Sequence, residues 1–175
     1  MVRAGPTGDL LEQLNSNDLD TVLTLDKKLC RPELTTLAQQ EEEIIFVTLS
    51  DSSHERDALI SLETLCAKPF ILTEHQASYR YELERHLSER ELSIRPILEI
   101  GNTETIINLL KKGMGISFLP RFTVEQQLQE GTLMELSTDL PRVCMYHQLL
   151  CHKGKWITPQ LKVFLELVQK YLSRK

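Results

Sequence analysis

Two predicted strand-to-helix corners carry hydroxyl side chains that could contact a small ligand. Thr73 ends a predicted strand, and Thr103 begins a predicted helix directly after the strand at 97–100. The first turn of a helix leaves backbone N–H groups unpaired, so such a corner suits an anion or a carboxylate. Ligands of open α/β sheets bind at corners of this kind. Either Asn102 or Thr103 could instead act only as the helix cap, which requires a side-chain acceptor and no ligand.

Charged groups near the same corners are further candidates. His75 lies in the loop after Thr73 and could line a cleft, and Arg80 in the first turn of the next helix could add a positive charge. Neutral hydroxyls and backbone amides would bind a small anion without a formal counter-charge. A solvent-exposed position without a ligand is the alternative for both His75 and Arg80.

The sequence contains no motif of an enzyme or of a metal site. A glycine-rich nucleotide loop, the HExxH motif and the GxSxG motif are all absent. The four cysteines form no CxxC pair and match no zinc spacing: Cys30, Cys66, Cys144 and Cys151. We therefore expect no catalytic residue, no cofactor, no metal and no enzymatic activity.

Composition places the chain among ordinary soluble globular proteins. Its net charge of −5 argues against a domain that binds nucleic acid through its own surface, because such a domain would normally show a basic patch. No run of about 18 apolar residues is present, so we expect no membrane contact. The first residues, MVRAGPTGDLL, lack the apolar block of a secretory signal. A cytoplasmic location with free, reduced thiols is the resulting expectation.

Strands and helices alternate along the chain, which predicts an α/β fold with a largely parallel sheet. The predicted strands cover residues 19–25, 44–49, 70–73, 97–100, 115–119, 133–136 and 143–151, and the first is expected to be buried on both faces. The predicted helices cover 9–15, 61–65, 77–91 and 122–129, and two more begin at Thr103 and at Thr158-Pro159. Residues 26–43 are expected to be irregular, and 51–57 to form a charged loop. Because the strands at 44–49 and 115–119 enclose a block with its own strands and helix, we expect two hinged lobes with a cleft between them.

Four segments resemble the effector-binding domain of LysR-type transcriptional regulators. They are DLLEQLNSNDLDTVLTL (9–25), PFILTEHQASYRYELERHL (69–87), EIGNTETIINLLKKGMGISFLPRFTVEQQLQEGTL (99–133) and KWITPQLKVFLELV (155–168). The most specific piece is the G-x-G-I-x-x-L-P ending at 113–120, followed by a helix and then by Gly-Thr-Leu. The resemblance implies a two-lobed α/β fold of the periplasmic-binding-protein-like type 2 class. Lobe one would comprise residues 1–46 and 119–175, and lobe two residues 47–118.

The same resemblance implies an N-terminally truncated form of this fold. No part of the chain matches the first strand and most of the first helix of lobe one, nor the helix-turn-helix domain that binds DNA in such regulators. DNA contact would then be made only through that missing domain. Domains of this family pair as homodimers, and the full regulators often form homotetramers.

The resemblance also implies a function: a small, often anionic metabolite binds in the cleft, and its binding is relayed to the DNA-binding domains to control transcription. The family's contacts fall here on the two corners and on the crossover strand, at Thr73, Glu74, His75, Asn102, Thr103, Ser117 and Phe118. A solute-binding protein of a transport system shares the fold and is the alternative, although the chain shows no secretory leader. An enzyme on this fold is a third possibility, but no paired acid and base converge on the cleft.

Overall fold

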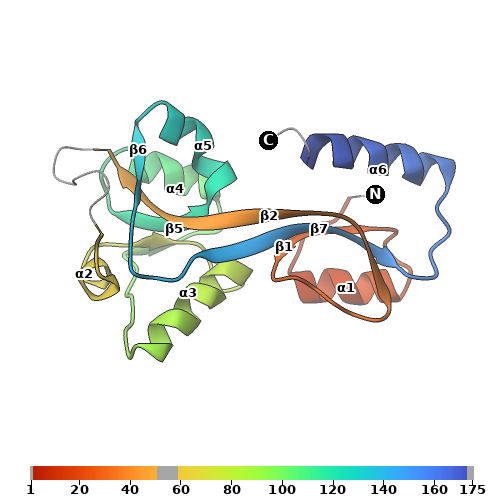
Figure 1. Ribbon diagram of the computed structural model, residues 1–175, viewed down its shortest axis with the longest axis horizontal. Helices are drawn as coiled ribbons and strands as arrows, with labels where there is room; N and C mark the ends of the chain where they lie inside the picture. Colours follow the sequence, from red (N-terminus) through yellow and green to blue (C-terminus); the bar gives the residue numbers. More distant parts are fainter. Residues whose placement is uncertain (1, 51–58, 173–175) are drawn as a thin grey trace. The chain divides into compact units, whose positions relative to one another are not determined.

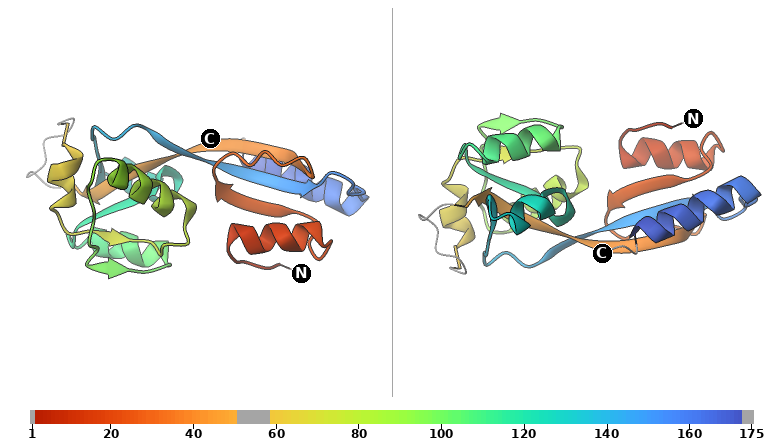
Figure 2. Two further views of the ribbon diagram at one scale, coloured as in Figure 1. Left: turned by 90° about the horizontal axis from the view of Figure 1, so that it is seen from below. Right: turned by 90° about the horizontal axis from the view of Figure 1, so that it is seen from above.

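The computed structural model describes residues 2–50 and 59–172 (Figures 1 and 2). The chain divides into two compact units, one of Met1–Glu42 with Met145–Lys175 and the other of Glu43–Cys144. These bounds differ from those of the expected lobes, 1–46 with 119–175 and 47–118. The second unit extends beyond residue 118 because the strands that follow pair within it. The predicted loop at 51–57 lies outside the described residues.

Five elements, two of them shared with the second unit, build the first unit: α1 (Thr7–Asn15), β1 (Val22–Asp26), the first part of β2 (Leu34–Leu49), most of β7 (Val143–His152) and α6 (Pro159–Leu172). Strand β1 pairs antiparallel with β7, which places Val22 opposite Leu150. These two residues form the buried core of the unit together with Leu11 and Leu14 of α1. Leu23 is 53% exposed, so β1 buries one face only and the expected burial of both faces is wrong.

Strand β2 is much longer than the sequence predicted. It runs for 16 residues, and its first part, residues 34–42, belongs to the first unit. The prediction of an irregular segment over 26–43 is wrong for this part. Its residues are mostly polar and lack the pattern by which strands are recognised, yet pairing with β7 holds them in the sheet. The second part of β2 matches the strand predicted at 44–49.

The second unit contains the rest of β2 and eight further elements: α2 (Leu62–Cys66), β3 (Ile71–Leu72), α3 (Ser78–Glu89), β4 (Leu98–Glu99), α4 (Thr103–Leu110), β5 (Ile116–Pro120), α5 (Arg121–Gln129) and β6 (Leu133–Leu136). Strands β5 and β6 pair antiparallel with β2, while β3 pairs parallel with β4. A parallel bridge between Phe70 and Ile116 joins the last two strands to β5. The strand order is therefore β6-β2-β5-β3-β4. The sheet is mixed rather than largely parallel, because alternating helices and strands do not fix the direction of a strand that passes between units.

Helices cover both faces of the second unit's strands (Figure 1). Helices α4 and α5 lie on one side, where Ile106 and Val124 pack with Ile45 and Val47 of β2. Phe46 alternates with these strand residues, so it faces the other side, where α3 lies.

The segment from 101 to 120 folds as its sequence predicted. Helix α4 ends before Gly113, which has a φ of 70°, and strand β5 follows. Gly115 has a φ of 148°, and a β-carbon there would lie 2.4 Å from the Pro69 carbonyl oxygen. The Ile116 amide donates to that same carbonyl at 2.9 Å. Glycine is therefore required for β5 to begin this close to the chain that leads into β3.

Candidate functional site

The ends of β3 and β4 meet at one edge of the second unit. The two strands run parallel with Leu72 opposite Glu99, and the Ile100 amide donates to the Leu72 carbonyl at 3.1 Å. The chain turns into α3 after the first strand and into α4 after the second. The Glu74 carboxylate lies against Gly101, since a β-carbon added there would be 3.1 Å from Glu74 Oε1. The two corners predicted from the sequence are therefore side by side.

The N-terminus of α4 is capped by Asn102 rather than by Thr103. Asn102 Oδ1 accepts hydrogen bonds from the Thr105 amide at 2.8 Å and from its hydroxyl at 3.1 Å. The first backbone bond of the helix runs from the Ile106 amide to the Asn102 carbonyl. The amides of Thr103 and Glu104 precede it, so the helix itself offers them no carbonyl partner.

Thr73 contributes a buried hydroxyl at the end of β3. Its side chain is 4% exposed, and Oγ1 has no hydrogen-bond partner among the described residues. Burial raises the pKa of the Tyr79 phenol, and a polar interaction with Thr73 opposes that rise. This contact lies outside hydrogen-bond geometry, so Thr73 Oγ1 remains unpaired. Because buried polar atoms are rarely left unpaired in native proteins, the hydroxyl is a candidate ligand contact.

Ser117 and Phe118 lie in the interior of the second unit. Their side chains are 0% and 2% exposed, and the Phe118 ring packs on Phe46 with 4.7 Å between the ring centroids. Because side chains alternate along β5, these two point to opposite faces of the sheet. Both lie within β5 rather than at a strand-to-helix corner, although Ser117 Oγ, like Thr73 Oγ1, has no hydrogen-bond partner among the described residues. The corner brings together four of the predicted residues: Thr73, Glu74, Asn102 and Thr103.

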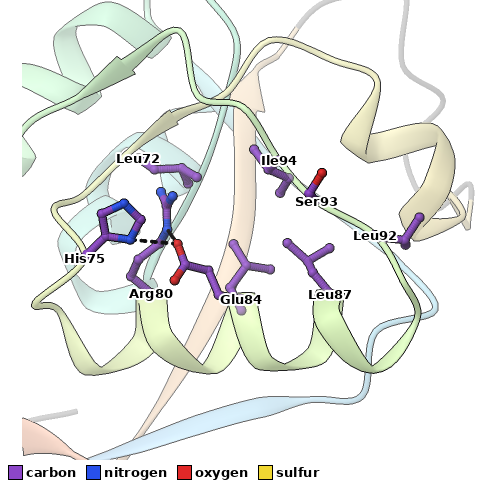
Figure 3. A pocket seen from close by; sticks show the side chains of 9 residues that line it. Leu72, His75, Arg80, Glu84, Leu87, Leu92, Ser93 and Ile94 are labelled. Carbon is purple, nitrogen blue, oxygen red and sulfur yellow. Dashed lines mark hydrogen bonds and ion pairs between the residues drawn. The ribbon is translucent and has the colours of Figure 1, made fainter.

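His75 belongs to a separate charged cluster beside α3 (Figure 3). Its Nδ1 lies 2.9 Å from Glu84 Oε1, and its Nε2 lies 3.4 Å from Glu99 Oε1. Arg80 contacts the same two carboxylates, through Nε to Glu84 at 2.6 Å and through Nη2 to Glu99 at 3.2 Å. Arg80 is 3% exposed, so the alternative of a solvent-exposed side chain is wrong for it. The four-residue spacing of Arg80 and Glu84 on one helix could have predicted this pair. The contact between Arg80 and Glu99 could not be predicted in this way, because it depends on the fold.

A pocket of about 280 Å³ lies beside this cluster, between α3 and the segment at 92–94 (Figure 3). Its lining is mostly apolar and consists of Leu72, Leu83, Leu87, Leu92 and Ile94 with His75, Arg80, Glu84 and Ser93. The sequence analysis missed this pocket, because the segment after α3 has no regular pattern that would place it against the helix.

The sequence analysis predicted neither catalytic residues nor a metal site. Among the residues that the structure describes, no group of three or more His, Cys, Asp or Glu side chains could hold a metal ion. Burial raises the pKa of the Cys66 and Cys151 thiols, which disfavours the reactive thiolate. None of the described helices is both long and apolar enough to cross a membrane.

The sequence matches the family model of the LysR substrate binding domain over residues 1–173. The chain belongs to this family. Relatives of this LysR domain include two HTH-type transcriptional regulators. YwqM of Bacillus subtilis is 31% identical over 161 residues, which cover 91% of this chain and 54% of YwqM. YeiE of Escherichia coli is 35% identical over 130 residues, which cover 72% of this chain and 43% of YeiE. The chain thus spans about half the length of the curated relatives it matches.

Solved structures similar to this LysR domain include regulatory and effector-binding domains. The regulatory domain of Synechocystis CcmR in complex with 2-PG has a TM-score of 0.79 and 18% identity, covering 99% of this chain and 83% of that one. The effector binding domain of QuiR in complex with shikimate has a TM-score of 0.71 and 17% identity, covering 95% and 78%. These likenesses confirm the predicted α/β fold of the two-lobed, periplasmic-binding-protein-like class. The relatives are transcriptional regulators, so the alternatives of a transport protein and an enzyme gain no support.

Proposed function

We propose that this domain is the ligand-sensing part of a LysR-type transcriptional regulator and binds a small anionic metabolite at the corner of β3, β4 and α4. The observation that carries the proposal is the buried, unpaired hydroxyl of Thr73 next to the corner where α4 begins. The first-turn amides of Thr103 and Glu104 suit a carboxylate or a phosphate, because the helix N-terminus favours negative charge. The hydroxyls of Thr73 and Thr103 would add neutral hydrogen bonds.

Two structural neighbours support a small-molecule effector. QuiR is described in complex with shikimate, and CcmR in complex with 2-PG. Shikimate is a carboxylate, the class of group that the first turn of α4 favours. Because the neighbours are only 17% and 18% identical, they support the proposal that the effector is a small molecule but do not identify that molecule.

We also propose that effector binding is relayed to helix-turn-helix domains outside this chain, in a cytoplasmic homodimer or homotetramer. The relatives are longer than the matched region, and their remaining part would make the DNA contact. Such a relay requires the effector to favour one arrangement of the regulator over another. No catalytic step belongs to this function.

A thermal-shift screen of the chain against a metabolite library that includes shikimate and 2-PG tests this proposal. A ligand at about 100 times its dissociation constant should stabilise the domain by roughly 2.7 kcal/mol. Substitution of Thr103 by Val removes the hydroxyl with little change in volume, so it should weaken effector binding roughly ten-fold. The melting temperature without ligand should stay the same.

Thr132→Val is the matched control, because it removes an exposed hydroxyl from the turn after α5. Its effector affinity should equal that of the unchanged chain. If Thr103→Val bound the effector as tightly as this control, the corner would not be the effector site.

A further inference from the structure

The buried guanidinium of Arg80 has one group without a partner. Its Nε and Nη2 donate to Glu84 and Glu99, but Nη1 makes no hydrogen bond with any described residue. An N–H group left unpaired at this depth is costly, and native proteins rarely keep one. Arg80 also lines the pocket beside α3. Nη1 therefore marks a position for an acceptor that the chain itself does not supply.

The pocket has the lining of a small-ligand site. Its volume of about 280 Å³ suits a molecule with a single ring, being slightly below the usual range for drug-sized ligands. Leu83 and Leu87 of α3 and Ile94 of the facing segment give it apolar walls. Figure 3 shows the Arg80 guanidinium and His75 at one end and Leu87 toward the other. This arrangement favours a ligand with an apolar body and one polar end.

The charges around Arg80 decide which polar end fits. One guanidinium faces two carboxylates, those of Glu84 and Glu99, at 2.6 and 3.2 Å. The His75 ring adds contacts to the same carboxylates. The positive charge of Arg80 is thus already matched, so an anionic ligand would meet net repulsion from two carboxylates. A neutral acceptor would satisfy Nη1 without adding charge.

We propose that this pocket is a second binding site, for a small neutral molecule with an apolar ring and one carbonyl or hydroxyl oxygen that accepts from Arg80 Nη1. The site is distinct from the corner proposed for the effector, because Asn102 and Thr103 do not line it. The two sites share the turn after β3, since His75 lines the pocket and Glu74 lies at the corner.

Three probes that differ only in their polar end test the proposal: cyclohexanecarboxamide, cyclohexanecarboxylate and cyclohexylmethylammonium. Each is titrated into the full chain at neutral pH, and the leucine and isoleucine methyl signals are followed by NMR. The carboxamide should shift the signals of Leu83, Leu87 and Ile94 saturably, with a dissociation constant on the order of 1 mM. The carboxylate should bind at least about ten-fold more weakly, since it meets the repulsion of Glu84 and Glu99. The ammonium should also bind at least about ten-fold more weakly, since it has no oxygen that could accept from Arg80 Nη1.

Two variants act on the site in different ways. Arg80→Met removes the donor and should abolish saturable carboxamide binding. Ile94→Trp fills the pocket from a half-buried position and keeps the Arg80 ion pairs, so it should also abolish carboxamide binding. This variant tests the site even if Arg80→Met fails to fold. Thr103→Val is the control at the effector corner and should leave carboxamide binding unchanged, whether or not it affects the effector.

Two results would overturn the proposal. The absence of saturable shifts with the carboxamide would mean that the pocket holds only solvent. Carboxylate binding equal to or tighter than that of the carboxamide would show that the site takes anions, and the neutral class would be wrong. Neither result would bear on the effector corner, which Thr103→Val tests separately.

Discussion

Glu74 places a negative charge at the corner where we propose that an anion binds. Its carboxylate lies against Gly101, one residue before the cap of α4. A carboxylate near a helix N-terminus is stabilised by the helix dipole. In the free domain, the Glu74 carboxylate would therefore provide the negative charge that a bound anion would otherwise provide. An anionic effector would have to move this exposed side chain aside. Glu74 is therefore expected to limit the affinity of the site rather than to create it.

Glu74→Gln should strengthen the binding of an anionic effector. Removing one charge a few ångströms from the ligand, in a partly exposed setting, is worth about 1 kcal/mol, or roughly five-fold in affinity. Isothermal titration with the ligand found by the thermal-shift screen measures the change. Glu130→Gln, which removes the same charge at the end of α5, should leave the affinity unaltered. Weaker binding by Glu74→Gln would show that the carboxylate contacts the ligand directly, as it would with a cationic or hydroxylated effector.

Asp139 connects two helices of the second unit through its carboxylate. Its Oδ1 accepts from the Leu62 amide at the start of α2 at 2.8 Å, and its Oδ2 from Arg90 Nη1 after α3 at 2.7 Å. These bonds, that from Arg90 first, lower the pKa of Asp139 from its ordinary value. The carboxylate therefore stabilises the fold above the unfolded-state pKa of about 3.9, and this contribution is lost as the pH falls through the lower folded-state value.

Asp139→Asn should consequently unfold at a lower urea concentration than the unchanged chain at neutral pH. The difference should shrink as the pH falls below about 4, because the carboxyl group of the unchanged chain becomes protonated as well. Urea titrations followed by circular dichroism at a series of pH values measure it. Arg90→Gln removes the other partner of this ion pair, and its difference in unfolding concentration from the unchanged chain should also shrink as the pH falls. A difference that stayed constant down to the lowest pH would contradict the assigned role of the charge.

At the scale of elements, Gly115 controls where β5 begins. Gly115→Ala should destabilise the domain by more than about 3 kcal/mol, because its β-carbon would collide with the Pro69 backbone at an unfavourable φ. Gly131→Ala is the matched control: its φ is also positive, at 69°, but no atom lies within 4 Å of the added β-carbon. It should cost only about 1–2 kcal/mol, the strain of the left-handed conformation. Chemical unfolding of both variants measures the difference, and equal losses would show that the approach to Pro69 relaxes easily.

Most elements could be predicted from sequence because their signals are local. Helix α4, its stop near Gly113 and strand β5 follow from a cap, an apolar stripe and two glycines within one short segment. The polar part of β2 could not be predicted, because its strand conformation depends on pairing with β7, about a hundred residues away in the chain. The prediction of a largely parallel sheet was wrong for the same reason, since no local sequence pattern indicates which strand pairs with which.

The candidate site also combines features that the sequence predicts locally with features that depend on the fold. That Thr73 and Thr103 follow neighbouring strands could be predicted from the strand-helix alternation, since parallel strands end at one edge. The choice of Asn102 as the cap required the hydrogen bonds to Thr105. The burial of Phe118 depends on the strands on either side of β5, and the pairing of Arg80 with Glu99 depends on β4 lying beside β3.

At the scale of the whole molecule, the second unit has a buried apolar cluster of its own. This cluster combines residues from β2, β3, α4, β5, α5 and β6, all of them between 43 and 144. The first unit has a smaller core, built on Leu11, Leu14, Val22 and Leu150. Its helix α6 leaves three apolar side chains exposed, those of Val163, Phe164 and Leu167. The second unit is therefore expected to be the more stable of the two.

A fragment of residues 43–144 should fold by itself. Its two ends are held together by an ion pair, since Arg142 Nε lies 3.0 Å from Glu43 Oε1. Glu43 also accepts from Arg121 Nε at 3.1 Å, which ties the same end to α5. Closing the ends in this way limits fraying of the β2 segment, although partly exposed ion pairs are each worth only about 0–1 kcal/mol. Most of the stability should come from the buried cluster, which the fragment keeps intact.

Amide proton–nitrogen NMR spectra of the fragment should be well dispersed and should overlay those of the same residues in the full chain. The carboxamide probe should bind the fragment as it binds the full chain, because every residue that lines the pocket beside α3 lies within 43–144. Arg142→Gln in the fragment should perturb signals near both ends while leaving those of the pocket in place. An unfolded fragment would show that the second unit depends on the first for its stability.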